Sequence, residues 1–169
     1  MKKYDLMHSI NTRGTYVCSK YAAKHLAKSD NGHILNISPP LDVFSQNTNW
    51  FAPHCAYTMA KYGMTLCAYG MAGEFKEEGI ACNTLWPRTA IATAAVQNLL
   101  GGESTMKVAR DPTIMSDAAY VILTSDSRKT TGNFYLDDEV LASNGETHME
   151  KYNCIKGTRN DDLAADYFS

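Results

Sequence analysis

The spacing of apolar residues changes several times along the chain between a helical and a strand-like period. Apolar side chains recur every three or four positions over residues 4–28 and again over 54–78, which predicts two long helices. The intervening run 33–38 is apolar at adjacent positions, Ile34 and Leu35, so we expect a strand that is covered on both faces. Strands of this kind are typical of parallel sheets.

The second half of the chain continues the alternation with shorter elements. Residues 80–86 predict a second strand, 90–100 and 111–124 two helices, and 132–137 a third strand. This order predicts an α/β fold with a doubly wound, Rossmann-type parallel sheet and flanking helices. Three strands are few for such a sheet, and the chain opens on a helix. We therefore expect the C-terminal part of the fold, with its first strands missing.

Two regions fall outside the alternation. Residues 41–53 read as a loop. The polar stretch 142–169 reads as a tail along the surface, with Tyr152 as one of its few anchors, so we expect a partial domain over 1–141 followed by this tail. Gly14 lies within the first predicted helix and suggests close packing against a neighbouring element.

Composition excludes several classes of function. Hydrophobic residues make up 44% and charged residues 20% of the chain, which is typical of a globular protein. A net charge of −2 indicates no nucleic-acid partner, and no apolar run reaches the roughly 18 residues of a membrane span. The five cysteines are odd in number and widely spaced, so we expect small buried hydrophobes rather than a metal site. A cytoplasmic protein is the default expectation.

Tyr57 and Lys61 form the sharpest chemical signal in the sequence. Residues four apart share one face of a helix, with Cα atoms about 6 Å apart along its axis. A tyrosine has a pKa near 10, which a neighbouring ammonium lowers, so the phenol becomes a usable general acid or base. The pair opens a helix that follows a strand, at the edge where open α/β sheets bind ligands. The same spacing also occurs in purely structural helices, so only the surrounding sequence can distinguish a catalytic pair from a structural one.

That context is a set of motifs in a specific order. The motifs are Asn11-Thr-Arg-Gly14, Ile34-Leu-Asn-Ile-Ser38, Tyr57-x-x-x-Lys61 and Asn83-Thr-Leu-Trp-Pro87. Together they resemble the second half of the short-chain dehydrogenase/reductase family, most firmly over residues 5–141. The runs Asn36-Ile-Ser-Pro-Pro40, Tyr57-Thr-Met-Ala-Lys-Tyr-Gly63 and Leu85-Trp-Pro-Arg-Thr-Ala-Ile91 are similar to its hydroxysteroid dehydrogenase-like protein 2 branch.

The resemblance implies a role for each matching residue in an NAD(P)-dependent oxidoreductase. Tyr57 would exchange a proton with the substrate oxygen, and Lys61 would bind the nicotinamide ribose and lower the pKa of Tyr57. Asn11 would hold a water of the proton relay, and Ser38 would orient the substrate. The segment that closes over the nicotinamide would contribute Pro87, Thr89, the backbone of Ile91, and Thr93.

The sequence departs from the family pattern in three places. Arg88 stands where the family has glycine. Pro39 occupies the usual position of the catalytic serine, so Ser38 is one residue early and is expected on the opposite face of its strand. The Gly-rich turn that binds the pyrophosphate is absent, so we expect an N-terminally truncated protein with impaired binding of NADP or NAD.

The resemblance also bears on substrate, partners and location. An apolar carbonyl or alcohol is the expected substrate, in a pocket shaped by 41–53 and 93–110. A homodimer through helices 4–28 and 54–78 is expected, and a eukaryotic source would favour mitochondria or peroxisomes over the cytoplasm. Two alternatives stay open: a non-catalytic truncated isoform that acts through protein interaction, and a binding module without chemistry.

Overall fold

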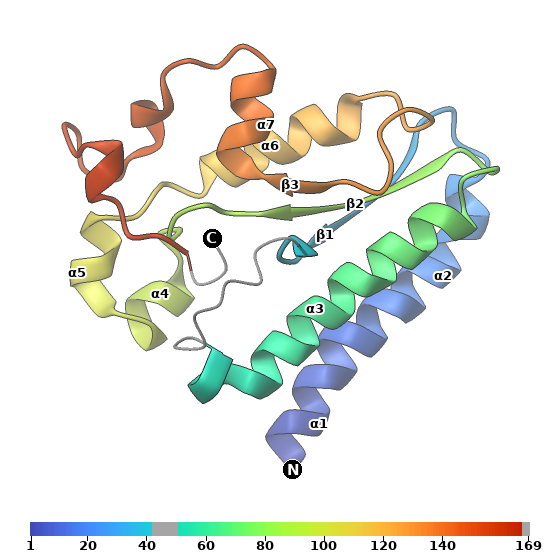
Figure 1. The fold of residues 1–169 in the computed structure, drawn as a ribbon, viewed down its shortest axis with the longest axis horizontal. Coiled ribbons are helices and arrows are strands. Elements are labelled where there is room, and N and C mark those ends of the chain that lie inside the picture. Colours follow the sequence, from blue (N-terminus) through green and yellow to red (C-terminus); the bar gives the residue numbers. More distant parts are fainter. Residues whose placement is uncertain (42–50, 167–169) are drawn as a thin grey trace. The chain divides into compact units, whose positions relative to one another are not determined.

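The computed structural model describes residues 1–41 and 51–166 (Figure 1). The backbone divides into two compact units, each of which we describe by itself. The first contains Met1–Trp86 and Leu123–Tyr135, and the second contains Pro87–Ile122 and the chain from Leu136 onward. This division is made by backbone packing, and the boundary expected at residue 141 stays a prediction.

The first unit begins with one continuous helical rod. It consists of α1 (Lys2–His8), the π-helical turn η1 (Ser9–Arg13) and α2 (Gly14–Leu26), which confirms the predicted helix over 4–28. The second predicted helix is also confirmed, as α3 (Phe51–Glu74). Figure 1 shows α3 running alongside this rod, and residues of α3 contact all three of its parts.

A three-stranded parallel sheet completes the first unit. Its strands are β1 (Gly32–Ile37), β2 (Ile80–Trp86) and β3 (Phe134–Leu136), in the order β1-β2-β3. The parallel α/β fold class is thus confirmed. All residues of β2 are buried, whereas Ile37 at the end of β1 is 44% exposed. β1 is covered less completely than expected, because Leu35 and Asn36 are only half-buried and Ile37 is exposed.

The core of this unit forms where α2 and α3 pack on the sheet. Its cluster of buried side chains consists of Ala23, Ile34, Met71, Ala72, Phe75, Ile80 and Cys82. Burial raises the pKa of the Cys82 thiol to about 12, so this cysteine behaves as the small hydrophobe that the sequence predicted. The same expectation was wrong for Cys18, Cys55 and Cys154, which are exposed.

The rod and α3 approach most closely at Gly63. A Cβ atom at this position would lie 2.5 Å from Thr12 Oγ1 and 2.7 Å from Thr12 Cγ2. The Thr12 hydroxyl donates a hydrogen bond to the Ala60 carbonyl at 3.1 Å, which fixes η1 against α3. The close approach expected at Gly14 was wrong, since a Cβ there would meet only Ser9 O of its own helix, at 3.4 Å.

The second unit is mostly helical. Its elements include α4 (Ala94–Leu99), α5 (Gly102–Lys107), α6 (Thr113–Thr124), α7 (Asp137–Ser143), η3 (Met149–Tyr152) and η4 (Asn160–Asp162), although α6 ends within the first unit. Asp111 lies two residues before α6, and its Oδ1 accepts a hydrogen bond from Thr113 N at 2.9 Å, as the side chain of a helix cap does. The sequence predicted neither α5 nor α7. No helix among residues 1–41 and 51–166 has the length and apolarity to cross a membrane.

We predict that Gly63→Ala lowers the free energy of unfolding by about 1–3 kcal/mol, because the new methyl overlaps Thr12. Gly70→Ala is the matched control in the same helix: a Cβ there meets nothing within 4 Å, so it should raise stability by up to about 1 kcal/mol. Urea denaturation followed by circular dichroism measures both. A Gly63→Ala variant as stable as Gly70→Ala would show that the two helices do not meet at this point.

Candidate active site

Lys61 lies at the carboxyl end of the parallel sheet. Its Nζ donates a hydrogen bond to the Ile37 carbonyl at 2.9 Å, at the last residue of β1. The same Nζ lies 5.3 Å from the ring centroid of Trp86, the last residue of β2. The ammonium is therefore fixed by the ends of two adjacent strands, at the edge where open α/β sheets bind their ligands.

Tyr57 lies one helical turn before Lys61 on α3, and both side chains are half-buried. The backbone of α3 is non-helical at His54, with φ −122° and ψ 25°, so Tyr57 belongs to the first turn after this kink. The four-residue spacing places the phenol and the ammonium on one face of a regular helix, as the sequence predicted.

Ser38 follows directly after β1 and is fully buried. Its Oγ has no hydrogen-bond partner among the described residues, and the same holds for Asn36 Nδ2 on β1 and Thr84 Oγ1 on β2. Asn36 and Thr84 are paired in the β1–β2 register, so they project from neighbouring positions of the sheet. Buried polar atoms without a partner are rare in folded proteins, and their gathering here marks this strand end as a polar site.

Asn11 lies within the π-helical turn η1. Its Nδ2 donates a hydrogen bond to the Met7 carbonyl at 3.0 Å, and the adjacent Thr12 hydroxyl bonds Ala60 O, next to Lys61 in α3. The structure thus places Asn11 in the turn that packs against the part of α3 carrying Tyr57 and Lys61. Single π-helical turns are often found at functional sites.

The segment after β2 belongs to the second unit. It runs extended and is hydrogen-bonded along one edge: Ala90 N donates to Ala164 O at 2.8 Å, and Ala92 N to Arg110 O at 2.9 Å. Thr89 is buried, and its Oγ1 has no partner within the described part of the chain. Thr93 caps α4, because its Oγ1 accepts a hydrogen bond from Val96 N.

Arg88 is tied to the acidic start of α7. Its backbone N–H donates to Asp137 Oδ1 at 3.0 Å, its Nε to Asp138 Oδ2 at 2.7 Å, and its Nη2 to Glu139. Asp137 is completely buried, and burial raises the pKa of its carboxyl above the usual value even though Arg88 N and Asp138 N donate to it. The sequence singled out Arg88 as a departure but gave no signal for its carboxylate partners.

The comparisons with known proteins agree with this geometry. The family model described as enoyl-(acyl carrier protein) reductase matches residues 1–138. The chain belongs to the short-chain dehydrogenase/reductase family. It is 54% identical over 152 residues to hydroxysteroid dehydrogenase-like protein 2 of Xenopus laevis, and 50% identical over 156 residues to that of Bos taurus.

Two solved structures with more than 40% sequence identity share the fold. A short-chain dehydrogenase of Mycobacterium thermoresistibile is 48% identical with a TM-score of 0.85, and a putative dehydrogenase of Xanthomonas campestris is 41% identical with a TM-score of 0.88. The present chain is covered to 98% and 100% but spans only 56% and 59% of those chains. The matches to the Xenopus and Bos relatives include 90% and 92% of this chain but only 35% and 36% of those proteins.

In its first unit the structure places Lys61 and Ser38 at the carboxyl end of β1, Tyr57 one helical turn before Lys61 on α3, and Asn11 in the turn η1 that packs on α3. It places Pro87, Thr89, Ile91 and Thr93 in the second unit, where they are described separately. The functional role of each residue stays a prediction. The loop expected to shape the substrate pocket lies largely outside the described residues, because 42–50 are not among them.

We predict that stability depends on pH through Asp137. Its folded-state pKa is raised, so the folded state binds the proton more tightly and stability falls as pH rises from about 4 through the folded value. Asp137→Asn keeps the acceptor for Arg88 N but does not titrate. Its free energy of unfolding relative to wild type should therefore increase with pH over this window, as urea denaturation at several pH values would measure.

Asp137→Ala is the comparison variant, because it removes the acceptor and leaves the two buried N–H groups of Arg88 and Asp138 unpaired. Relative to Asp137→Asn it should cost about 1–3 kcal/mol for each unpaired group, and this difference should not change with pH, because neither variant titrates at this position. If the difference between Asp137→Asn and wild type stayed constant from acid to neutral pH, Asp137 would not titrate in that range and the prediction would be wrong.

Proposed function

We propose that this chain carries the proton-transfer residues of an NAD(P)-dependent oxidoreductase that interconverts an apolar carbonyl compound and its alcohol. The observation that carries the proposal is the position of the Lys61 ammonium. It is hydrogen-bonded to the Ile37 carbonyl at the end of β1, one helical turn from Tyr57. A cation at this place stabilises negative charge on a neighbouring phenol oxygen, which general acid–base work by a tyrosine requires.

The residues present fit a nicotinamide nucleotide. Sugar hydroxyls and a carboxamide need polar protein groups. The first unit offers the buried Ser38 Oγ and the second unit the buried Thr89 Oγ1, each without a partner among the described residues. We propose that Lys61 holds the nicotinamide ribose and that Pro87, Thr89, the backbone of Ile91 and Thr93 belong to the segment facing the carboxamide. The bound nucleotide supplies or accepts the hydride.

In the reductive direction, Tyr57 donates its phenolic proton to the substrate oxygen, and in the oxidative direction it takes the proton back. Lys61 stabilises the phenolate between these steps. Asn11, in the η1 turn beside this part of α3, holds the water through which the proton exchanges with solvent. Ser38, whose hydroxyl is fully buried at the end of β1, orients the substrate oxygen.

This prediction is tested in a fusion protein. The segment of the Mycobacterium thermoresistibile homologue that precedes its match to this chain is joined ahead of Met1, and NADPH oxidation is followed with medium-chain aldehydes and ketones. Tyr57→Phe should lower kcat at least ~100-fold, because the proton donor is lost. Tyr69→Phe makes the same change in the same helix at an exposed position and should leave kcat within about twofold.

The two variants losing activity equally would sink the assignment of Tyr57 as the proton donor. The 169-residue chain alone serves as the cofactor comparison. It lacks the Gly-rich turn, so we propose that calorimetry detects no NADPH binding to it, whereas the fusion protein binds. Tight binding by the chain alone would contradict that part of the proposal.

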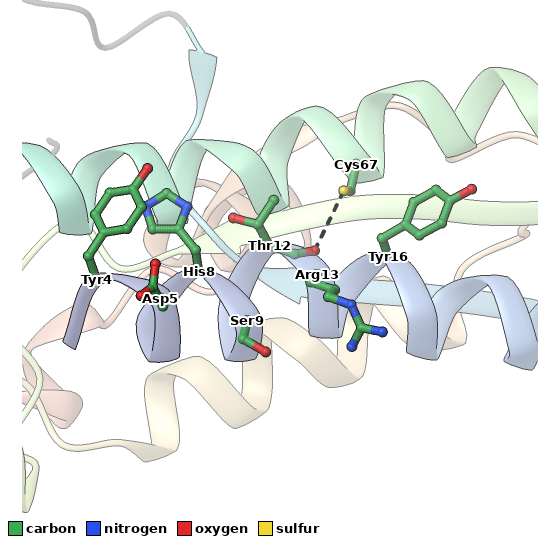
Figure 2. A pocket seen from close by; sticks show the side chains of 8 residues that line it. All are labelled: Tyr4, Asp5, His8, Ser9, Thr12, Arg13, Tyr16 and Cys67. Atoms are coloured by element: carbon green, nitrogen blue, oxygen red, sulfur yellow. Dashed lines mark hydrogen bonds between the residues drawn. The ribbon is translucent and has the colours of Figure 1, made fainter. Parts of the chain in front are cut away.

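We also propose that two copies of the chain associate through the helical rod and α3. A mostly apolar groove of about 560 Å³ is lined by Tyr4, Asp5, His8, Ser9, Thr12, Arg13, Tyr16 and Cys67 (Figure 2). Exposed Leu6 and Ile10 lie on the same rod. Asp5 and Arg13 have opposite charge and lie two turns apart, so a two-fold axis near Ser9 would place Asp5 opposite the partner subunit's Arg13.

We predict that the charge reversals Asp5→Arg and Arg13→Asp each weaken dimerisation about tenfold, since each places like charges across the axis. The double variant restores opposite charges and should dimerise like wild type. Sedimentation velocity measures the association, with Lys28→Glu, outside the groove, as the charge-matched control. A double variant no better than the single ones would exclude this antiparallel arrangement.

A further inference from the structure

Trp86 lies beside the ammonium of Lys61 but has no part in the roles considered so far. It is the last residue of β2, is only 5% exposed, and its ring centroid lies 5.3 Å from Lys61 Nζ. An indole attracts a cation more strongly than any other aromatic side chain, and it does so best where water is excluded. The buried ring therefore offers Lys61 an electrostatic contact as well as a packing surface.

Two fixed groups approach the ammonium from adjacent strands. Ile37 is paired with Leu85 in the parallel register, so Trp86 extends β2 one position beyond that pair. Ile37 O accepts one N–H of Lys61 at 2.9 Å, and the indole lies against the same Nζ. Lysine has a flexible four-carbon stem, so two such contacts on rigid strand ends remove much of the freedom of its charged end.

We propose that Trp86 is a positioning residue that holds the Lys61 ammonium at the carboxyl end of the sheet, ready to bind a sugar hydroxyl of the dinucleotide. The inference rests on the proposed function for the hydroxyl-binding step, but not for the contact itself. Trp86 acts through Lys61 and touches no reacting atom. Its role differs from simple packing because it depends on the aromatic ring and on the charge of Lys61.

The experiment first examines the 169-residue chain without any dinucleotide. Lysines are labelled with ¹³C, and Lys61→Met identifies the Lys61 Cε signal in the spectrum. The indole ring current should shift this signal away from those of the solvent-exposed lysines, and its relaxation should report restricted motion. Trp86→Phe should reduce both effects and Trp86→Leu should abolish them. Phe134→Leu removes an aromatic ring that packs on Tyr69 and should leave the signal unchanged.

The second part uses the fusion protein and a double-mutant cycle. Trp86→Leu should raise KM for NADPH about tenfold and Trp86→Phe about threefold, with a smaller change in kcat. In the Lys61→Met background, Trp86→Leu should cause no further change in KM, because the charge it positions is gone. Circular dichroism shows whether each variant is folded. If Trp86→Leu does not fold, Trp86→Phe still tests the proposal.

Two results would overturn the proposal. One is a Lys61 signal that is unshifted and mobile in wild type, and the other is an equal effect of Trp86→Leu on KM with and without Lys61, as a packing role alone would give. A fusion protein without hydride transfer would count against the proposed function only, because the Lys61 signal still shows whether Trp86 restrains the ammonium.

Discussion

The hydrogen bond from Lys61 Nζ to the Ile37 carbonyl is the contact on which the candidate site depends. It connects the helix that carries Tyr57 to the end of β1, and it uses a backbone acceptor that parallel pairing with β2 holds in place. A carbonyl leaves the positive charge intact, so it remains able to stabilise negative charge on a neighbouring oxygen.

The position of α3 sets where that ammonium lies, and a second group of contacts fixes the helix. Thr65 Oγ1 donates to the Pro39 carbonyl at 2.7 Å, just beyond β1, and Thr12 Oγ1 donates to Ala60 O at 3.1 Å. Gly63 lies between these two anchors and permits the close approach of the rod. The conformation of the site thus follows from backbone and hydroxyl contacts on either side of one helical turn.

Much of the first unit could be predicted from sequence because its signals are local. The period of apolar residues gave the rod, α3 and β2, and the order of the elements gave the α/β class. Exposure could not be predicted in the same way: Ile37 is as apolar as Ile34 of the same strand, yet Ile34 is buried and Ile37 is 44% exposed. Whether Gly14 or Gly63 marks a close approach depends on which residue lies opposite each glycine. The sequence does not show that Thr12 lies opposite Gly63, because this contact exists only in the tertiary structure.

The second unit was harder to predict for a different reason. Its helices α5 and α7 have only 6 and 7 residues, too few to show a clear period, and the run of three carboxylates that opens α7 resembles a solvated turn. The charge of that run was visible in the sequence, but its partner lies 49 to 51 residues earlier, at Arg88. The pairing of Tyr57 with Lys61 could be predicted, because both residues lie four positions apart on one helix.

Arg88 stands where the family has glycine, and its contacts give that substitution a physical reason. A glycine could offer Asp137 only its backbone N–H, whereas the arginine adds hydrogen bonds to Asp138 and Glu139. Downstream, Arg88 O accepts from Asp166 N and Ala90 N donates to Ala164 O, so the same segment is also paired with the end of the described chain. A segment tied both by the Arg88 side chain and by these backbone hydrogen bonds has less conformational freedom than a glycine at position 88 would allow. The stretch after β2 is therefore fixed within its unit by hydrogen bonds of both its backbone and the Arg88 side chain.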